Sequence, residues 1–323
     1  MAPSGAIFIA FPFTDIILGA KLSTCEHSVN ILILGPGAIG SLWATKFEAS
    51  GHSVSLWSTS SEPRLTLQLD QQPPQTFSNR SINSVEQADL ILVTVKAWQV
   101  DTALHPLMRH ISPDAIIVLM HNGMGTAEAV GHKMPNNPLV LATTTHGAYK
   151  PSKQQVLHTG IGQTQLGGFN SLGNKCSFLE EVFTHAFPVV AWNNNIHHAL
   201  WTKLAINCAI NPLTAINQIK NGQLAAQDHQ LEINGLLDEI YPVLAAEQIP
   251  LSREQLSQTI NHVIEVTAAN HSSMQQDIFH RRPSEIDFIT GYLLERAQHH
   301  GISTPKNHKL YQAIKNIEQS WNQ

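Results

Sequence analysis

The sequence has few charged residues, few cysteines and no long uninterrupted hydrophobic run. Asp, Glu, Lys and Arg make up 13% of the 323 residues, and the formal net charge is −5. A chain without clustered lysines and arginines has no basic stripe for nucleic acid and no polybasic segment for an anionic membrane, so we expect neither partner. The 42% hydrophobic content is enough to fill folded cores and excludes disorder over most of the chain.

Cysteine and histidine patterns give no sign of a metal site. The three cysteines, Cys25, Cys176 and Cys208, lie far apart and form neither a disulfide framework nor paired zinc ligands. The 18 histidines occur singly or as doublets, and none lies in an HExxH or zinc-finger pattern. We therefore expect small buried cysteines and no bound metal.

The N-terminal segment is apolar but is typical neither of a membrane span nor of a secretory signal. Residues 6–20 include Pro12 and Asp15 and are fewer than the roughly 20 residues that a span needs. No Lys or Arg precedes them, whereas a secretory signal starts with positive charge. We expect residues 1–28 to be an N-terminal extension.

A glycine-rich motif in the right context predicts a dinucleotide site. The β-rich run 29–34 leads directly into the motif, a predicted helix spans 41–50, and a second strand follows over 52–57. The first glycine of such a motif permits a tight turn, the second a close approach to a pyrophosphate, and the third packing of helix on strand. The motif residues are Gly35, Pro36, Gly37, Ala38, Ile39 and Gly40.

The end of the second strand bears on the choice between NAD and NADP. Folds that select NAD usually place Asp or Glu there to bind the ribose 2'-hydroxyl. This chain has only hydroxyl side chains at 58–61. The first carboxylate, Glu62, comes several residues after the predicted end of the strand, and Arg64 follows it. Hydroxyls and an arginine suit a 2'-phosphate, which favours NADPH.

Three more strands predict a doubly wound α/β domain. They span 90–95, 115–120 and 139–145, with helical connections between them. Ligands in such sheets bind beyond the carboxyl ends of strands, where Lys96 and the segment 121–125 follow. Both are candidates for a site on topology alone.

After about residue 190 the apolar residues follow helical spacing instead of strand-like runs. The chain is also longer than the roughly 250–300 residues at which a single core usually stops growing, which predicts a second domain. Apolar residues at three- and four-residue spacing predict helices over 199–210, 231–246, 260–269 and 286–297. We expect a dinucleotide-binding domain at 29–194 and an all-helical domain at 195–323.

Polar residues in this second domain provide candidates for a substrate site. Lys203, Asn207 and Asn211 are spaced four residues apart, so they stack on one face of an apolar helix. They could be core amides paired with backbone, but beside a nucleotide domain a substrate cleft is the stronger interpretation. Further on, Ser284 could cap a helix opened by Glu285, whose plain alternative role is a first-turn acid.

Motifs along the chain resemble the ketopantoate reductase (2-dehydropantoate 2-reductase) family, from about Val29 to near the C-terminus. They read GPGAIG, VKAWQV, HNGMGT, TTTHGA, WTKLAINCAINPLTA, NGQL, SSMQQDI and SEIDFITG. The resemblance implies a Rossmann-like domain followed by an all-helical domain, an architecture like that of 6-phosphogluconate dehydrogenase. It also implies cytoplasmic, NADPH-dependent reduction of the keto acid 2-dehydropantoate to pantoate, towards pantothenate and coenzyme A.

The resemblance also assigns roles by matching position. Lys203 matches the catalytic lysine that binds the substrate and protonates the ketone oxygen, and Asn122 and Glu285 match residues at the nicotinamide end of the cofactor. Lys96 and Ala148 match further cofactor positions. The matching substrate-binding positions, besides Lys203, are Asn207, Asn211, Asn221, Asn270, His271, Ser272 and Ser273.

One position departs from the family pattern. Thr59 stands where family members often have an arginine for the 2'-phosphate, and Arg64 is the candidate that compensates. Two alternatives stay open: a related reductase of another 2-keto acid, and a non-catalytic NADP-binding sensor. A sensor needs the glycine loop but no proton donor, which argues against it. The oligomeric state is open, with a homodimer as one option.

Overall fold

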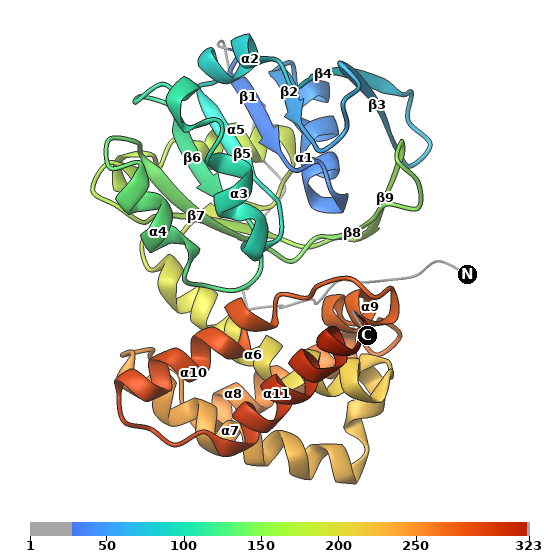
Figure 1. Ribbon diagram of the computed structural model, residues 1–323, viewed down its shortest axis with the longest axis vertical. Helices are drawn as coiled ribbons and strands as arrows, with labels where there is room; N and C mark the ends of the chain where they lie inside the picture. Colours follow the sequence, from blue (N-terminus) through green and yellow to red (C-terminus); the bar gives the residue numbers. More distant parts are fainter. Residues whose placement is uncertain (1–27, 322–323) are drawn as a thin grey trace, which may run out of the picture.

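The computed structural model describes residues 28–321, and in this part a sheet-containing half lies against a helical half (Figure 1). The predicted N-terminal extension, residues 1–28, lies outside the described residues except for Ser28. The strands form one eleven-stranded sheet in the order β11-β10-β7-β6-β5-β1-β2-β4-β3-β9-β8.

The centre of the sheet is parallel and confirms the predicted α/β fold. Four of its strands are short apolar runs with both faces covered, as is typical of parallel sheets. The five predicted strands all occur, with ends within two residues of the expected ones. The predicted strands are β1 (Asn30–Leu34), β2 (Ser53–Trp57), β5 (Leu90–Val93), β6 (Ile116–Leu119) and β7 (Leu139–Thr144). A sixth parallel strand beside β2, β4 (Gln75–Asn79), was not predicted.

Strands on both edges of the sheet were not predicted. Many of their residues are polar or glycine, so they lack the apolar runs that marked the central strands. They comprise β3 (Arg64–Leu69), β8 (Gly147–Tyr149), β9 (Gln155–Gly160), β10 (Thr164–Gly168) and β11 (Val190–Trp192).

Helices cover both faces of the sheet. On one face, Trp43 and Phe47 of α1 (Ala38–Ala49) pack against Phe183 of α5 (Leu179–Ala186) with ring centroids 5.0 Å from the Phe183 ring. The other face packs against three further helices. These are α2 (Ile82–Glu86), α3 (Val100–Leu104) and α4 (Thr126–Lys133).

The helical half is built around one long central helix, α6 (Ile196–Asn217), which leads out of the sheet half (Figure 1). Its Cys208 is fully buried, as expected, and Cys176 is buried in the sheet half. No helix in residues 28–321 is long and apolar enough to span a membrane. The remaining helices are α7 (Gln227–Ala246), α8 (Arg253–Val266), α9 (Ser273–Phe279), α10 (Thr290–His299) and α11 (Pro305–Ser320).

One helix prediction is wrong in detail. The segment 286–297 is not one helix, because Ile286–Phe288 forms a single 3-10 turn and α10 begins at Thr290. Ser284 caps no α-helix; its backbone N and Oγ both donate to Oε1 of Glu318, at 2.8 and 2.7 Å. This long-range partner on α11 has no local sequence signal.

Candidate active site

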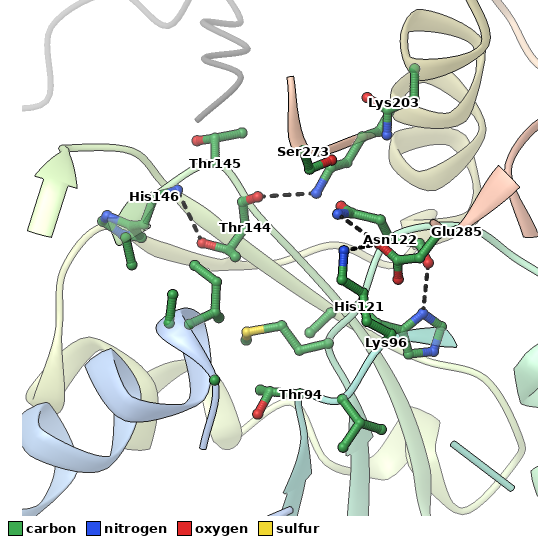
Figure 2. Close-up of a pocket in the computed structure, with 18 of the residues that line it drawn as sticks. Thr94, Lys96, His121, Asn122, Thr144, Thr145, His146, Lys203, Ser273 and Glu285 are labelled. Carbon is green, nitrogen blue, oxygen red and sulfur yellow. Dashed lines mark hydrogen bonds and ion pairs between the residues drawn. The ribbon is translucent and has the colours of Figure 1, made fainter. Parts of the chain in front are cut away.

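A cavity of about 300 Å³ lies where the carboxyl ends of the central strands face α6 and the start of α9 (Figure 2). Both halves of the chain contribute to it, so it occupies the position that the sheet topology predicts for a ligand. The sheet half contributes Gly37, Ala38, Ile39, Thr94, Val95, Lys96, Met120, His121, Asn122, Ala142, Thr144, Thr145, His146 and Ala148, and the helical half contributes Lys203, Asn207, His271, Ser273 and Glu285.

Lys203 reaches across the cavity from α6. Its Nζ donates a hydrogen bond to the backbone oxygen of Thr144, at 3.1 Å, where β7 ends (Figure 2). Burial lowers the pKa of Lys203 to about 8, against a smaller opposing effect of the Glu285 charge. The ammonium is therefore charged at neutral pH but gives up its proton more readily than an exposed lysine.

Glu285 ties the helical half to the ends of two strands. Its Oε1 accepts a hydrogen bond from the backbone N of Ala97 at 3.0 Å, and its Oε2 accepts one from Nδ2 of Asn122 at 3.4 Å. Only 4% of Glu285 is exposed. Because both oxygens have partners across the cleft, Glu285 is more than a first-turn acid: it fixes the side chain of Asn122.

Lys96 is held by two carboxylates. Its Nζ lies 2.6 Å from Oδ2 of Asp277 and 3.6 Å from Oε2 of Glu285. Burial lowers the pKa of Lys96, but the two carboxylates outweigh it and raise the pKa above its usual value. Lys96 is thus a fixed positive charge and a poor proton donor.

The three histidines of the cavity, His121, His146 and His271, are neutral at neutral pH, because burial lowers the pKa of each. Burial lowers the pKa of His146 to about 4 and also lowers that of His121. The ring nitrogens of His121 lie 3.0 Å from the backbone oxygen of Asn122 and 2.9 Å from Oγ1 of Thr126. Among the cavity residues, Lys203 is therefore the group best able to supply a proton.

The predicted polar stack on α6 occurs, but its members differ in depth. Lys203 and Asn207 line the cavity, and Oδ1 of Asn207 is buried with no hydrogen-bond partner in the described structure. Asn211 is fully buried beyond the lining residues, and neither atom of its amide has a partner there. Asn207 thus has an unused acceptor beside Lys203.

Other predicted substrate residues divide into two groups. His271 and Ser273 line the cavity. Asn221, Asn270 and Ser272 do not: Nδ2 of Asn221 donates to Thr267, the Asn270 carbonyl accepts from the Asn221 backbone, and Ser272 caps α9. Asn221, Asn270 and Ser272 thus support the segment that carries His271 and Ser273. Contacts of these three residues with the substrate stay a prediction.

The glycine loop lies at one end of the cavity. Gly37, Ala38 and Ile39 line it, whereas Gly35, Pro36 and Gly40 lie outside the lining. A Cβ on Gly40 would lie 2.3 Å from Oγ1 of Thr94, so only glycine lets α1 pack this closely.

The two residues predicted for the ribose end lie outside the cavity. Thr59 is exposed after β2, and Arg64 is exposed at the start of β3, with β4 between it and β2. The structure thus brings neither to the cavity lining.

Several residues around the cavity were not predicted. Thr144 ends β7, and Thr145 and His146 follow it, so the rule that selected Lys96 applied to them as well. Lys150 had no signal: its Nζ donates to the Pro36 backbone oxygen at 2.7 Å and to Oγ of Ser41 at 2.9 Å. Residues 28–321 contain no group of three or more His, Cys, Asp or Glu side chains that could hold a metal.

Comparison with known proteins places these features in one family. Residues 31–171 match the family described as "Ketopantoate reductase PanE/ApbA", and residues 195–318 match its C-terminal part. A 2-dehydropantoate 2-reductase of Vibrio cholerae is 53% identical over 293 residues, covering 91% of this chain and 99% of its own. One from Escherichia coli O157:H7 is 38% identical, covering 91% and 96%.

A solved structure agrees with this relationship. The PanE/ApbA family ketopantoate reductase from Ralstonia eutropha JMP134 superimposes with a TM-score of 0.80 at 25% identity, covering 91% of this chain and 99% of its own. Identity over nearly the whole length of the relatives covers both halves and the cavity between them. The chain therefore belongs to the ketopantoate reductase family of dinucleotide-dependent oxidoreductases.

Proposed function

We propose that the protein reduces ketopantoate to pantoate with NADPH. The observation that carries this proposal is Lys203, a half-buried lysine with a pKa of about 8 that faces the strand ends and the glycine loop across one cavity. We infer the substrate from the relatives with 53% and 38% identity, which are named 2-dehydropantoate 2-reductases. Pantoate formation places the reaction on the route to pantothenate and coenzyme A, for which we propose a cytoplasmic location.

The residues of the glycine loop fit a dinucleotide. A Cβ on Gly37 would have no heavy atom closer than 4.0 Å, so the space beside its backbone is open. No side chain caps α1, which leaves its N-terminus suited to a pyrophosphate. A bound cofactor would supply hydride to the ketone carbon, and Asn122 and Glu285 would hold its nicotinamide end.

In this proposal Lys203 binds the ketone oxygen and transfers its proton to it as negative charge develops there. Asn122, fixed by Glu285, positions the reacting carbon. Asn207, His271 and Ser273 bind the hydroxyl and carboxylate groups of the substrate. We propose a matching division of labour, with residues 29–194 binding the cofactor and 195–323 the substrate, and a homodimer as the assembly.

The pH dependence of turnover tests the role of Lys203. Its proton is present below a pKa of about 8 and is lost as the pH rises through that value. We expect kcat at saturating NADPH and ketopantoate to fall across this range, because the enzyme-substrate complex loses its acid. A kcat that is constant from neutral to well above pH 8 would contradict proton donation by Lys203.

Lys150 gives a separate prediction for the cofactor. Burial lowers its pKa to about 8, and its Nζ bonds to the glycine loop. We expect Lys150→Met to weaken NADPH binding about tenfold or more, because the variant loses both the bond that holds the glycine loop and the positive charge beside the proposed pyrophosphate position. Fluorescence titration with NADPH measures this, and Lys153→Met, at an exposed position, is the control. Equal affinities in the two variants would exclude Lys150 from the cofactor site.

A panel of 2-keto acids tests the substrate. We expect kcat/KM with NADPH to be highest for ketopantoate, and lower for keto acids without its branched hydroxyl-bearing chain, because they leave polar groups such as Asn207 unpaired. A higher kcat/KM for another 2-keto acid would favour the related-reductase alternative. NADPH binding without turnover of any keto acid would favour the sensor.

A further inference from the structure

The carboxyl end of β2 is the position that reads the ribose 2' substituent in a dinucleotide fold. β2 ends at Trp57, and the next carboxylate along the chain is Glu62. No acidic residue therefore directly follows β2, where it could bind a 2'-hydroxyl. Thr59 offers a single hydroxyl and no positive charge, so a 2'-phosphate would need a cation from another segment.

Arg80 comes from the neighbouring strand to this position. β4 lies beside β2 and runs parallel to it, so the two strands end at the same edge of the sheet. Arg80 directly follows β4, and its backbone N donates to the Leu56 oxygen at 3.0 Å. The guanidinium carbon lies 5.5 Å from the centroid of the Trp57 ring, and Nη1 donates to the Ser58 oxygen at 3.4 Å.

Asn79 fixes the loop that follows β2 against the end of β4. It is 4% exposed, and its Oδ1 accepts from the Ser58 backbone N at 3.2 Å. Its Nδ2 donates to the backbone carbonyl oxygens of Ser60 and Glu62, at 3.1 and 2.6 Å. Asn79 therefore holds the loop after β2, and the next residue, Arg80, places its guanidinium beside the end of β2.

We propose that Arg80 is the residue that binds the 2'-phosphate and selects NADPH over NADH. A guanidinium has five N–H donors, and the bond to Ser58 uses one of them. Arg80 forms no ion pair with a carboxylate of residues 28–321, so its charge is available to a phosphate, which it can bind through two parallel hydrogen bonds.

The same strand order makes Arg64 a weaker candidate for the 2'-phosphate than Arg80. Arg64 opens β3, which is separated from β2 by β4, and it lies opposite Ser78. This inference rests on the NADPH preference proposed above, and it assigns that preference to a residue about twenty positions beyond the end of β2. Both arginines are exposed, so Arg64→Gln serves as a matched control for Arg80→Gln.

Binding of cofactor fragments to the full chain is the test. We expect wild-type protein and Arg64→Gln to bind 2',5'-ADP more tightly than ADP in calorimetric titration. Arg80→Gln should lose about 10- to 100-fold in affinity for 2',5'-ADP and change little for ADP, because only the phosphate contact is removed. Arg80→Lys, which keeps the charge without the planar fork, should lie between the two.

Steady-state kinetics gives the second readout. We expect kcat/KM for NADPH to fall by a similar factor in Arg80→Gln while kcat/KM for NADH stays within about twofold. Unchanged 2',5'-ADP affinity in Arg80→Gln, or an equal loss in Arg64→Gln, would overturn the assignment. Wild-type protein that binds both fragments equally would overturn it as well, together with the NADPH preference, whereas absence of ketopantoate turnover would contradict only the proposed reaction.

Discussion

Lys203→Ala is expected to lower kcat for ketopantoate reduction by about 10²- to 10⁴-fold, the range for loss of a positioned general acid. The side chain spans the cleft from α6 to the Thr144 oxygen, and the neighbouring Lys96 is held by Asp277 and Glu285. Among the residues that line the cavity, no other ammonium is therefore free to replace it. The affinity for NADPH should change little, and initial rates at saturating cofactor measure the effect.

Lys203→Arg separates the charge from the proton. Arginine keeps the positive charge but does not release a proton near neutral pH, so a proton donor is lost while electrostatic stabilisation is retained. We expect this variant to stay far below wild type. Full activity in Lys203→Arg would mean that Lys203 acts by charge alone. Lys153→Ala, which removes an exposed lysine, should be as active as wild type.

Two glycine substitutions are expected to have opposite effects. A Cβ at position 40 would lie 2.3 Å from Oγ1 of Thr94 and 2.5 Å from the Gly35 oxygen. We expect Gly40→Ala to lower the free energy of unfolding by about 1–3 kcal/mol, as overpacking does. A Cβ at position 37 has no neighbour closer than 4.0 Å, so Gly37→Ala should leave stability unchanged.

The affinity for NADPH should be affected more in Gly37→Ala than in Gly40→Ala, the reverse of the order for stability. The methyl group of Gly37→Ala fills the open space beside the backbone, where we place the pyrophosphate, and should weaken NADPH binding by about tenfold or more. Chemical denaturation and NADPH titration of both variants make the comparison. Normal NADPH affinity in a stable Gly37→Ala protein would show that the pyrophosphate does not approach this loop.

The parts of the fold that could be predicted are those with strong local signals. The strands β1, β5, β6 and β7 contain runs of apolar residues, and the glycine motif directly follows the first of these strands. The edge strands β8 to β11 have mixed composition and owe their structure to pairing with distant segments, such as β10 with β7. The start of α10 at Thr290 was missed, because the bond of Ser284 to Glu318, 34 residues away, has no local sequence signal.

For the site too, residues with local sequence signals could be predicted, and those that depend on long-range contacts could not. Four-residue spacing on a helix was enough to group Lys203 with Asn207 and Asn211, and the family resemblance named Glu285. Spacing could not reveal that Asn211 lies deeper than the other two. Nor could it show that Arg80, rather than Arg64, lies beside the end of β2, because this depends on the strand order β2-β4-β3.

The most direct test of the account is a single-turnover experiment on wild-type protein and Lys203→Ala. Each protein is saturated with NADPH and mixed with ketopantoate, the loss of NADPH absorbance is followed, and the product is identified by mass spectrometry. We expect wild type to form one pantoate per bound NADPH, and Lys203→Ala to retain its NADPH on the same timescale. Equal rates in the two proteins, or no pantoate from wild type, would contradict the account.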